Sequence, residues 1–265
     1  MDNTQLSVPQ PVRQFKKDAL NVEIFESQPA MALNAAHTVR NYLIGQLEAN
    51  GSVRAILATG NSQIQFLKTL IDLGGVDWSR VTLFHMDEYL GISETHKASF
   101  RLYMKERVES LVKPQNFHYL IGDAPLPLDE CERYSKLLQE APIDLCCLGV
   151  GENGHIAFND PPVADLRDPH LVKLVKLDDA CKIQQVNEGH FPSLEAVPPY
   201  AFTLTIPALC AAKKMICLSP ETRKAKAVQA ALEGEIGTLC PASALREQSQ
   251  ATIYLDQDSS ALLGQ

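Results

Sequence analysis

A histidine in a glycine-rich loop is the first candidate for chemistry in this sequence. His155 follows three glycines, at positions 149, 151 and 154, and the loop comes directly after the short, mostly apolar run 143–148. So short an apolar run is typical of a strand that is covered on both faces in a parallel sheet. Ligands of α/β proteins bind at the carboxyl ends of such strands. Because histidine titrates near neutral pH, the loop predicts a group that transfers protons.

Two adjacent acids follow a second strand-like run, residues 81–86. Neighbouring side chains of an extended chain point in opposite directions, so at most one of Asp87 and Glu88 faces a given cleft. A carboxylate at the end of a strand suits proton abstraction from a ligand. A solvated turn would have the same composition, and these two residues alone leave both interpretations open.

A small polar turn joins the strand-like run 53–58 to the amphipathic helix 63–73. The turn consists of Thr59, Gly60, Asn61 and Ser62. A helix that begins after such a turn presents backbone N–H groups to an anion. The alternative is an ordinary connection with a serine cap. The turn matches neither a P-loop nor a dinucleotide fingerprint, so a nucleotide is not indicated.

Basic residues gather near the start of a predicted helix over 219–233, which Ser219 would cap. They include Arg223 and Lys224. Positive charge at a helix N-terminus opposes the helix dipole, which favours an anionic partner. A solvated basic face is the common alternative.

The composition excludes several classes of protein. The 265-residue chain carries a formal net charge of −8, so we expect no binding to nucleic acid or to an acidic membrane surface. No apolar stretch reaches the ~20 residues that cross a membrane, and the first residues lack the apolar segment of a secretory signal. The seven cysteines include no C-x-x-C pair. We therefore expect reduced thiols in a cytoplasmic protein, with no metal site.

Strand-like and helix-like patterns alternate along the chain. We expect one doubly wound α/β domain over residues 1–265, with a mostly parallel, Rossmann-like sheet and helices on both faces. Residues 1–19 are predicted to form a loosely ordered polar arm, and residues 21–25 an edge strand. The stretch 178–199 reads as irregular, which indicates either a lid or an element with an obscured pattern.

Several motifs together resemble the glucosamine-6-phosphate deaminase/isomerase family, which shares its fold with the 6-phosphogluconolactonases. The most specific are FHMDEYLG at 84–91, LGVGENGHIAFNDP at 148–161 and TRKAKAVQAALEG at 222–234. In addition, ATGNS at 58–62 resembles the phosphate loop of the family, and VPPYAFTLTIPAL at 197–209 resembles a later strand. The likeness covers most of the chain from about residue 30.

The resemblance implies deamination and aldose–ketose isomerisation of a sugar phosphate, from glucosamine 6-phosphate to fructose 6-phosphate and ammonia. It implies no redox cofactor and no metal. By position, Asp87 corresponds to the base that removes the proton from C2 of the opened sugar. His155 corresponds to the histidine that opens the ring, and residues 59–62 and Lys224 to the phosphate ligands.

A carboxylate or amide partner is needed to fix the tautomer of His155, and Asn153 and Asp160 are placed to supply it. Both depart from the family pattern, which often has an acid at the first position and a glutamate at the second. The family also places an arginine ahead of the strand at 197–209, where this chain has Glu188 nearby. Lys182 or His190 are candidates to contact the phosphate instead.

Two other functions remain open at this point. A sugar-phosphate lactonase would use the same fold, although the I-A-F-N-D-P sequence after His155 differs from the lactonase pattern. A non-catalytic sugar-phosphate sensor is the further alternative, although residues 1–30 are too short and polar for a DNA-binding module. The sequence does not determine the oligomeric state, and a homo-oligomer is one of the possibilities.

Overall fold

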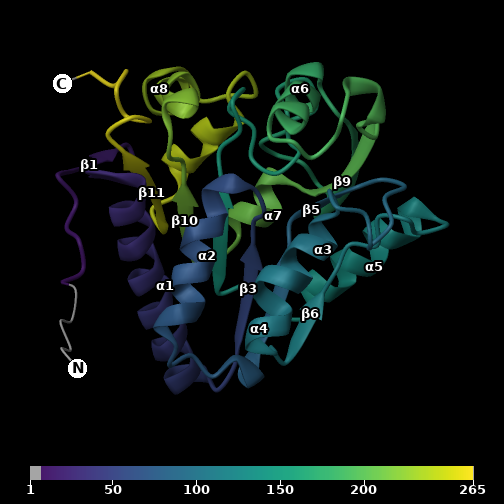
Figure 1. The fold of residues 1–265 in the computed structure, drawn as a ribbon, viewed down its shortest axis with the longest axis horizontal. Helices are drawn as coiled ribbons and strands as arrows, with labels where there is room; N and C mark the ends of the chain where they lie inside the picture. The colour runs from purple at the N-terminus through teal and green to yellow at the C-terminus, as the bar shows by residue number, and fades with distance from the viewer. Residues whose placement is uncertain (1–6, 265) are drawn as a thin grey trace.

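The computed structural model describes residues 7–264 and contains a sheet of eight strands and a sheet of three (Figure 1). All neighbours in the large sheet are parallel except the outermost pair, β1 and β2. In spatial order, the large sheet consists of β1 (Arg13–Lys17), β2 (Leu20–Phe25), β11 (Ala251–Asp256), β10 (Lys214–Leu218), β7 (Leu145–Gly149), β3 (Val53–Leu57), β4 (Val81–His85) and β6 (Asn116–His118).

The order of the strands reverses between β3 and β7. The chain runs from β3 through β4 to β6 on one side, and it then returns to β7 on the other side and continues to β10 and β11. Ligands of open α/β sheets bind at such a switch point, outside the carboxyl ends of the strands. The turn after β3 and the glycine loop after β7 therefore meet where a ligand site is expected.

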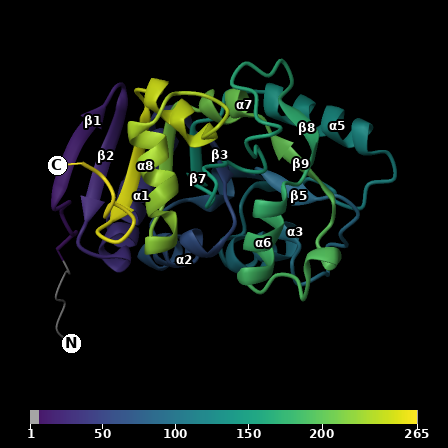
Figure 2. The same ribbon diagram turned by 90° about the horizontal axis from the view of Figure 1, so that it is seen from above.

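Helices cover both faces of the large sheet, which confirms the doubly wound architecture (Figure 2). Helices α1 and α2 pack on one face, and α5, α7 and α8 on the other. The side chains of β7 alternate between the two cores, with Leu145 and Cys147 in one and Cys146 and Leu148 in the other. The helices are α1 (Gln28–Asn50), α2 (Asn61–Leu73), α3 (Phe100–Met104), α4 (Ser110–Val112), α5 (Pro127–Gln139), α6 (Asp179–Asn187), α7 (Ile206–Cys210) and α8 (Ala225–Glu233).

A small antiparallel sheet stands beside the carboxyl ends of the large one. It consists of β5 (Asp87–Tyr89), β9 (Tyr200–Leu204) and β8 (Val172–Lys176). The chain leaves the large sheet at Met86 and enters the small one with Asp87. No second sheet is predicted from the sequence, because a strand of three residues is too short to show a period.

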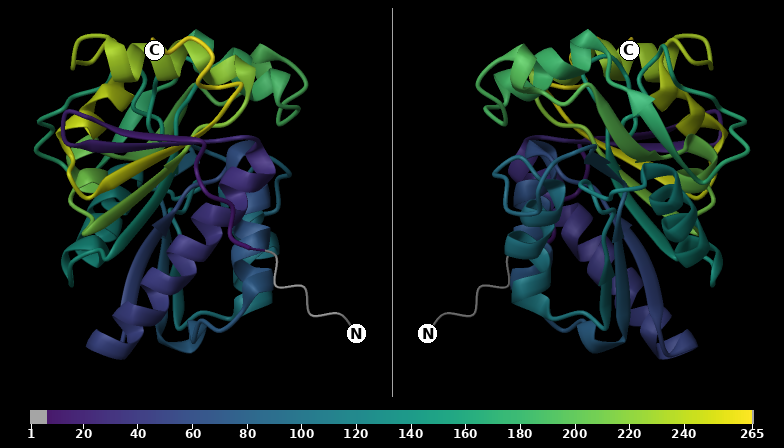
Figure 3. Two further views of the ribbon diagram at one scale, coloured as in Figure 1. Left: turned by 90° about the vertical axis from the view of Figure 1, so that its left-hand side faces the viewer. Right: turned by 90° about the vertical axis from the view of Figure 1, so that its right-hand side faces the viewer.

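The prediction of a loosely ordered arm over residues 1–19 is wrong for residues 13–17. Residues 13–17 form β1, which pairs with β2 and takes the edge position that was expected for residues 21–25. The basic side chains of β1 hid the strand, although such charges are typical of sheet edges. In Figure 3 the two purple strands lie beside the yellow β11, which pairs with β2. Residues 1–6 of the arm lie outside the described part.

The stretch 178–199 is not irregular, because it contains α6 and a short 3-10 turn at Leu194–Ala196. Asp178 caps α6 by accepting a hydrogen bond from the N–H of Ala180. The helix was missed because its buried face carries two glutamines. None of the helices in the described residues is long and apolar enough to cross a membrane.

Candidate active site

A cleft opens at the switch point of the large sheet. Its walls come from the turn after β3, the loop after β7, the small sheet, α6 and the segment before α8. Seven of the nine residues predicted for the site are placed by the structure on its surface: Thr59, Gly60, Asn61, Ser62, Asp87, His155 and Lys224. Asn153 and Asp160 do not line the cleft but stand behind His155, as described below.

The turn after β3 presents the N-terminus of α2 to the cleft. Gly60 takes the N-cap position with φ +97°, a conformation that favours glycine, and no side chain in the described part of the chain caps this end. The hydroxyl of Tyr103 donates a hydrogen bond of 3.1 Å to the carbonyl of Gly60, which fixes the turn. The open N–H groups of the first helical turn suit an anion.

Asp87 is a buried carboxylate that faces the cleft. Its side chain is 6% exposed, and its Oδ1 atom has no hydrogen-bond partner within residues 7–264. Burial, together with the charge of Glu88, raises the pKa of Asp87 well above its usual range. A carboxylate of raised pKa is a stronger proton acceptor, which is the property required of a general base.

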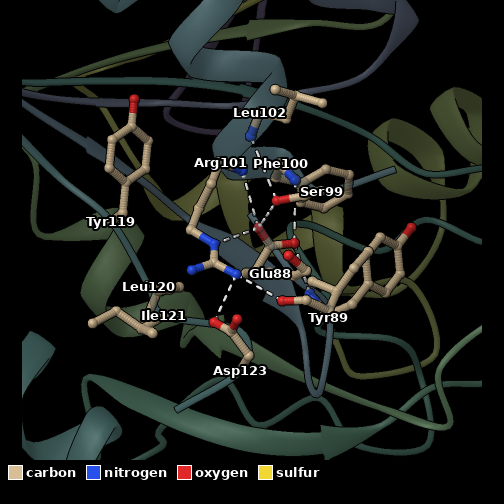
Figure 4. A network of polar contacts seen from close by, with 12 residues as sticks. Glu88, Tyr89, Ser99, Phe100, Arg101, Leu102, Tyr119, Leu120, Ile121 and Asp123 are labelled. Carbon is tan, nitrogen blue, oxygen red and sulfur yellow. Dashed lines mark hydrogen bonds and ion pairs between the residues drawn. The ribbon is translucent and has the colours of Figure 1, made fainter. Parts of the chain in front are cut away.

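Glu88 points away from the cleft, which confirms that only one of the two acids enters it. Its carboxylate accepts hydrogen bonds from the Ser99 hydroxyl at 2.7 Å and from the backbone N–H groups of Phe100 and Arg101 at 3.1 and 3.0 Å (Figure 4). The Arg101 guanidinium lies 3.5 Å away. Glu88 thus ties β5 to the start of α3 and holds the backbone on which Asp87 stands.

His155 is oriented by Asp160. The Nδ1 atom of the imidazole lies 2.8 Å from Oδ1 of Asp160, so Nε2 is left for a ligand. Burial opposes the charge of Asp160, but the contacts with His155 and Asn153 outweigh it and lower the pKa of the carboxyl. Asn153 does not touch the ring. Its amide nitrogen donates to Asp160 at 2.9 Å, and its oxygen accepts from the N–H of His155 at 3.1 Å.

Gly151 makes room for the imidazole. A Cβ atom at this position would lie 2.2 Å from two atoms of the His155 ring. The next turn of the loop is strained, because Ala157 has φ +51°. Strain of this kind concentrates at functional sites, where the surrounding contacts hold it in place.

Lys224 lies in the 3-10 turn η4 (Thr222–Lys224), which precedes α8. The predicted helix over 219–233 therefore starts six residues later, at Ala225, and Ser219 does not cap it. Glu221 interrupts the expected helix with φ +81°, and its N–H donates to Asp256. Lys224 is 4% exposed, and its pKa is lowered by burial and by Arg223.

The sequence pattern missed part of the wall that α6 contributes. Gln184, Gln185, Glu188 and His190 line the cleft. His190, one of the two candidates named for the phosphate, lies 3.3 Å from Glu188. Lys182, by contrast, does not line the cleft and pairs with Asp179. The signal that could have found this wall is the helix cap at Asp178.

Glu188 is charged despite its burial. Burial alone would raise the pKa of this carboxyl, but hydrogen bonds from His190 and Arg223 outweigh it and lower the pKa to about 2. Its Oε1 atom accepts from Arg223 at 2.6 Å and from Gln184 at 3.0 Å. A negative charge therefore stands where the family resemblance implies an arginine.

The structure brings together one group of possible metal ligands that the sequence spacing did not reveal. Ligand atoms of His155, Asp160 and Cys181 lie within 4.8 Å of one another. All three residues are buried, and Asp160 is already in contact with His155 and Asn153. The group thus forms a closed polar cluster that supports the imidazole.

Comparisons with known proteins agree with the resemblance seen in the sequence. The model of the family described as glucosamine-6-phosphate isomerases/6-phosphogluconolactonase matches residues 26–254. A glucosamine-6-phosphate deaminase of Streptococcus suis is 35% identical over 237 residues, which are 86% of this chain and 98% of the relative. A glucosamine-6-phosphate deaminase of Bacillus cytotoxicus is 30% identical over 243 residues, which are 92% of this chain and 89% of the relative.

Solved structures show the same fold. A monomeric glucosamine-6-phosphate deaminase superposes with a TM-score of 0.84 at 28% identity, over 91% of this chain and 99% of that one. A 6-phosphogluconolactonase from Shewanella baltica superposes with a TM-score of 0.74 at 16% identity, over 89% and 97% of the two chains. The matched family model and the relatives at 30% identity or more give the family directly: this chain belongs to the glucosamine-6-phosphate isomerase/6-phosphogluconolactonase family.

Proposed function

We propose that the protein converts glucosamine 6-phosphate into fructose 6-phosphate and ammonia in the cytoplasm. The observation that carries the proposal is the shared cleft of Asp87 and His155. An unpartnered buried carboxylate and an oriented imidazole stand there together with an open helix N-terminus and a buried lysine. The names of the relatives from Streptococcus suis and Bacillus cytotoxicus support the same reaction.

The two ends of the substrate have different requirements. The phosphate needs N–H groups and a cation, which the turn at residues 59–62 and Lys224 supply. The sugar needs groups that move protons. His155 takes the proton of the C1 hydroxyl and gives a proton to the ring oxygen. The bond between C1 and the ring oxygen breaks, which leaves the open aldehyde, and Asp160 stabilises the imidazolium that forms between the two transfers.

Asp87 then removes the proton from C2 of the open sugar. The electron pair of the C2–H bond forms a C1–C2 double bond, and the C1 oxygen takes a proton, which gives an enolamine. Return of the proton from Asp87 to C1 leaves an iminium at C2. Water adds to C2 and ammonia leaves, so that a ketone remains. The raised pKa of Asp87 favours the first of these transfers.

The test is ammonia release coupled to fructose 6-phosphate formation, with glucosamine 6-phosphate as the substrate. We expect turnover by the wild type and a loss of about 10³-fold or more in the Asp87→Asn variant, because general bases contribute up to about 10⁴-fold. The matched control is Asp72→Asn, which changes a largely exposed aspartate on α2. An active, well-folded Asp87→Asn variant would remove the proposed base.

A lactonase needs no base to remove a proton from C2. Assays of the same protein with the two substrates therefore distinguish a lactonase from a deaminase. Hydrolysis of 6-phosphogluconolactone without action on glucosamine 6-phosphate would favour the lactonase. Binding of the amino-sugar phosphate without turnover would favour a sensor. The Oδ1 atom of Asp87, which has no partner among residues 7–264, argues for the deaminase over both alternatives.

A further inference from the structure

Arg223 lines the same cleft as Lys224 and the N-terminus of α2. Its side chain is 29% exposed, so the guanidinium is partly open to the cleft. Arg223 and Lys224 follow each other in the turn η4, and the charge of Arg223 contributes to the lowered pKa of Lys224. The two cations therefore act on the same part of the cleft.

Three carboxylates hold the guanidinium through its Nε and Nη1 atoms. Its Nε atom donates to Glu221 at 2.6 Å, and its Nη1 atom donates to Glu188 at 2.6 Å and to Glu152 at 3.1 Å. Nη2 donates to no protein acceptor within residues 7–264. Since a guanidinium has five N–H donors, two of them stay available on Nη2 for a ligand.

The holding groups are themselves fixed. Glu188 receives further hydrogen bonds from Gln184 and lies next to His190, so it is not free to follow a ligand. Glu221 has φ +81°, and its N–H donates to both oxygens of Asp256 at 3.2 and 3.1 Å. A non-glycine residue in this conformation costs free energy and persists only where neighbours enforce it. These contacts fix the turn and, with it, the position of Arg223.

Charge alone does not attract a phosphate to this place. The two cations stand with three carboxylates, which leaves a formal charge of −1 before a ligand enters. Recognition therefore depends on directed hydrogen bonds, and a planar guanidinium edge matches the oxygens of a phosphate.

We propose that Arg223 is a second phosphate-binding residue, which presents the N–H groups of its Nη2 atom to the substrate phosphate beside Lys224. The inference rests on the proposed function, because it assigns the residue to the phosphate end of that same cleft. It explains how the site binds a phosphate with Glu188 where an arginine was expected. The carboxylates orient the guanidinium and leave Nη2 for the ligand.

The test compares Arg223→Gln with Arg223→Lys. We expect each to raise the KM for glucosamine 6-phosphate by about tenfold or more, with kcat within about threefold of wild type, since a charge-assisted hydrogen bond is lost. Lysine keeps the charge but lacks the planar fork, so the two variants should fail alike. Arg246→Gln is the matched control, because Arg246 pairs with Asp18 away from the cleft.

Binding of inorganic phosphate, followed by calorimetry, makes the result independent of turnover. We expect Arg223→Gln and Arg223→Lys to raise the Kd for phosphate by about the same factor as they raise the KM for glucosamine 6-phosphate. Such a loss in a protein without deaminase activity would support the phosphate role while the proposed reaction fails. Phosphate binding of wild-type strength in a folded Arg223→Gln variant would overturn the inference, as would full rescue by lysine.

Discussion

The carboxylates at the two ends of the cleft differ in their partners. At the proton-transfer end, Asp87 is buried and one of its oxygens has no partner among the described residues. At the end that we propose for the phosphate, Glu188, Glu221 and Glu152 each contact Arg223. The first carboxyl has a raised pKa, whereas the pKa of Glu188 is lowered to about 2.

This difference follows the tasks of the two ends. A base must change its protonation state during the reaction, so a site that leaves it unpaired keeps it reactive. A residue that positions a ligand must keep its charge and its place, so hydrogen bonds on every side are an advantage. Substitutions can therefore test whether each end behaves as its partners predict.

Among the residues that support Asp87 and His155, the largest effect is expected from Gly151→Ala, which pushes the imidazole. The new Cβ atom would lie 2.2 Å from the His155 ring, so the ring or the loop must shift. Misplacement of a catalytic group by about 1 Å costs on the order of 10²-fold in rate. Steady-state kinetics should show this loss in kcat with little change in phosphate binding.

Gly45→Ala is the control for that variant. Gly45 lies inside α1, and an added Cβ atom there meets nothing within 4 Å. We expect wild-type kinetics and a gain of about 0.5–1 kcal/mol in the free energy of unfolding. Wild-type kcat in Gly151→Ala would show that the position of His155 does not limit the reaction.

A smaller loss is expected from Asp160→Asn, which keeps the shape of the residue but removes the charge beside His155. Hydrogen bonds to charged groups contribute about 1.5–3 kcal/mol, so kcat should fall by about tenfold or more. Thermal unfolding should show that the variant is folded. If Asp160→Asn retains full kcat, the ring does not need a charged partner.

The smallest effect concerns Glu88, which acts on Asp87 through its charge. The reaction requires deprotonated Asp87, so kcat/KM should fall as the pH drops through the raised pKa of this group. Glu88→Gln removes one cause of the raised pKa, and the acidic limb of the profile should therefore move to lower pH. Glu130→Gln, at a second buried glutamate, should leave that limb in place. If the acidic limb stays in place in Glu88→Gln, the charge of Glu88 does not influence the pKa of Asp87.

Short local signals predicted much of this arrangement. The apolar runs before Thr59 and Gly149 are neighbouring strands, so their loops meet at one cleft. The wall from α6 was missed despite the cap at Asp178, because two of its buried side chains are glutamines and the helix shows no apolar period. The place of Arg223 depends on Glu221 and Asp256, which are distant in sequence and meet only in the fold.

Exchange of the C2 proton is the most direct test of Asp87 as the base. Glucosamine 6-phosphate is incubated with the protein in D₂O, and the recovered substrate and product are analysed by NMR. If Asp87 is the base, the proton that it holds at the enolamine stage exchanges with D₂O before it returns to carbon. We therefore predict deuterium at C2 of the substrate or C1 of fructose 6-phosphate with the wild type. Asp87→Asn should bind inorganic phosphate normally and incorporate none. Exchange by Asp87→Asn at the wild-type rate would contradict the central claim.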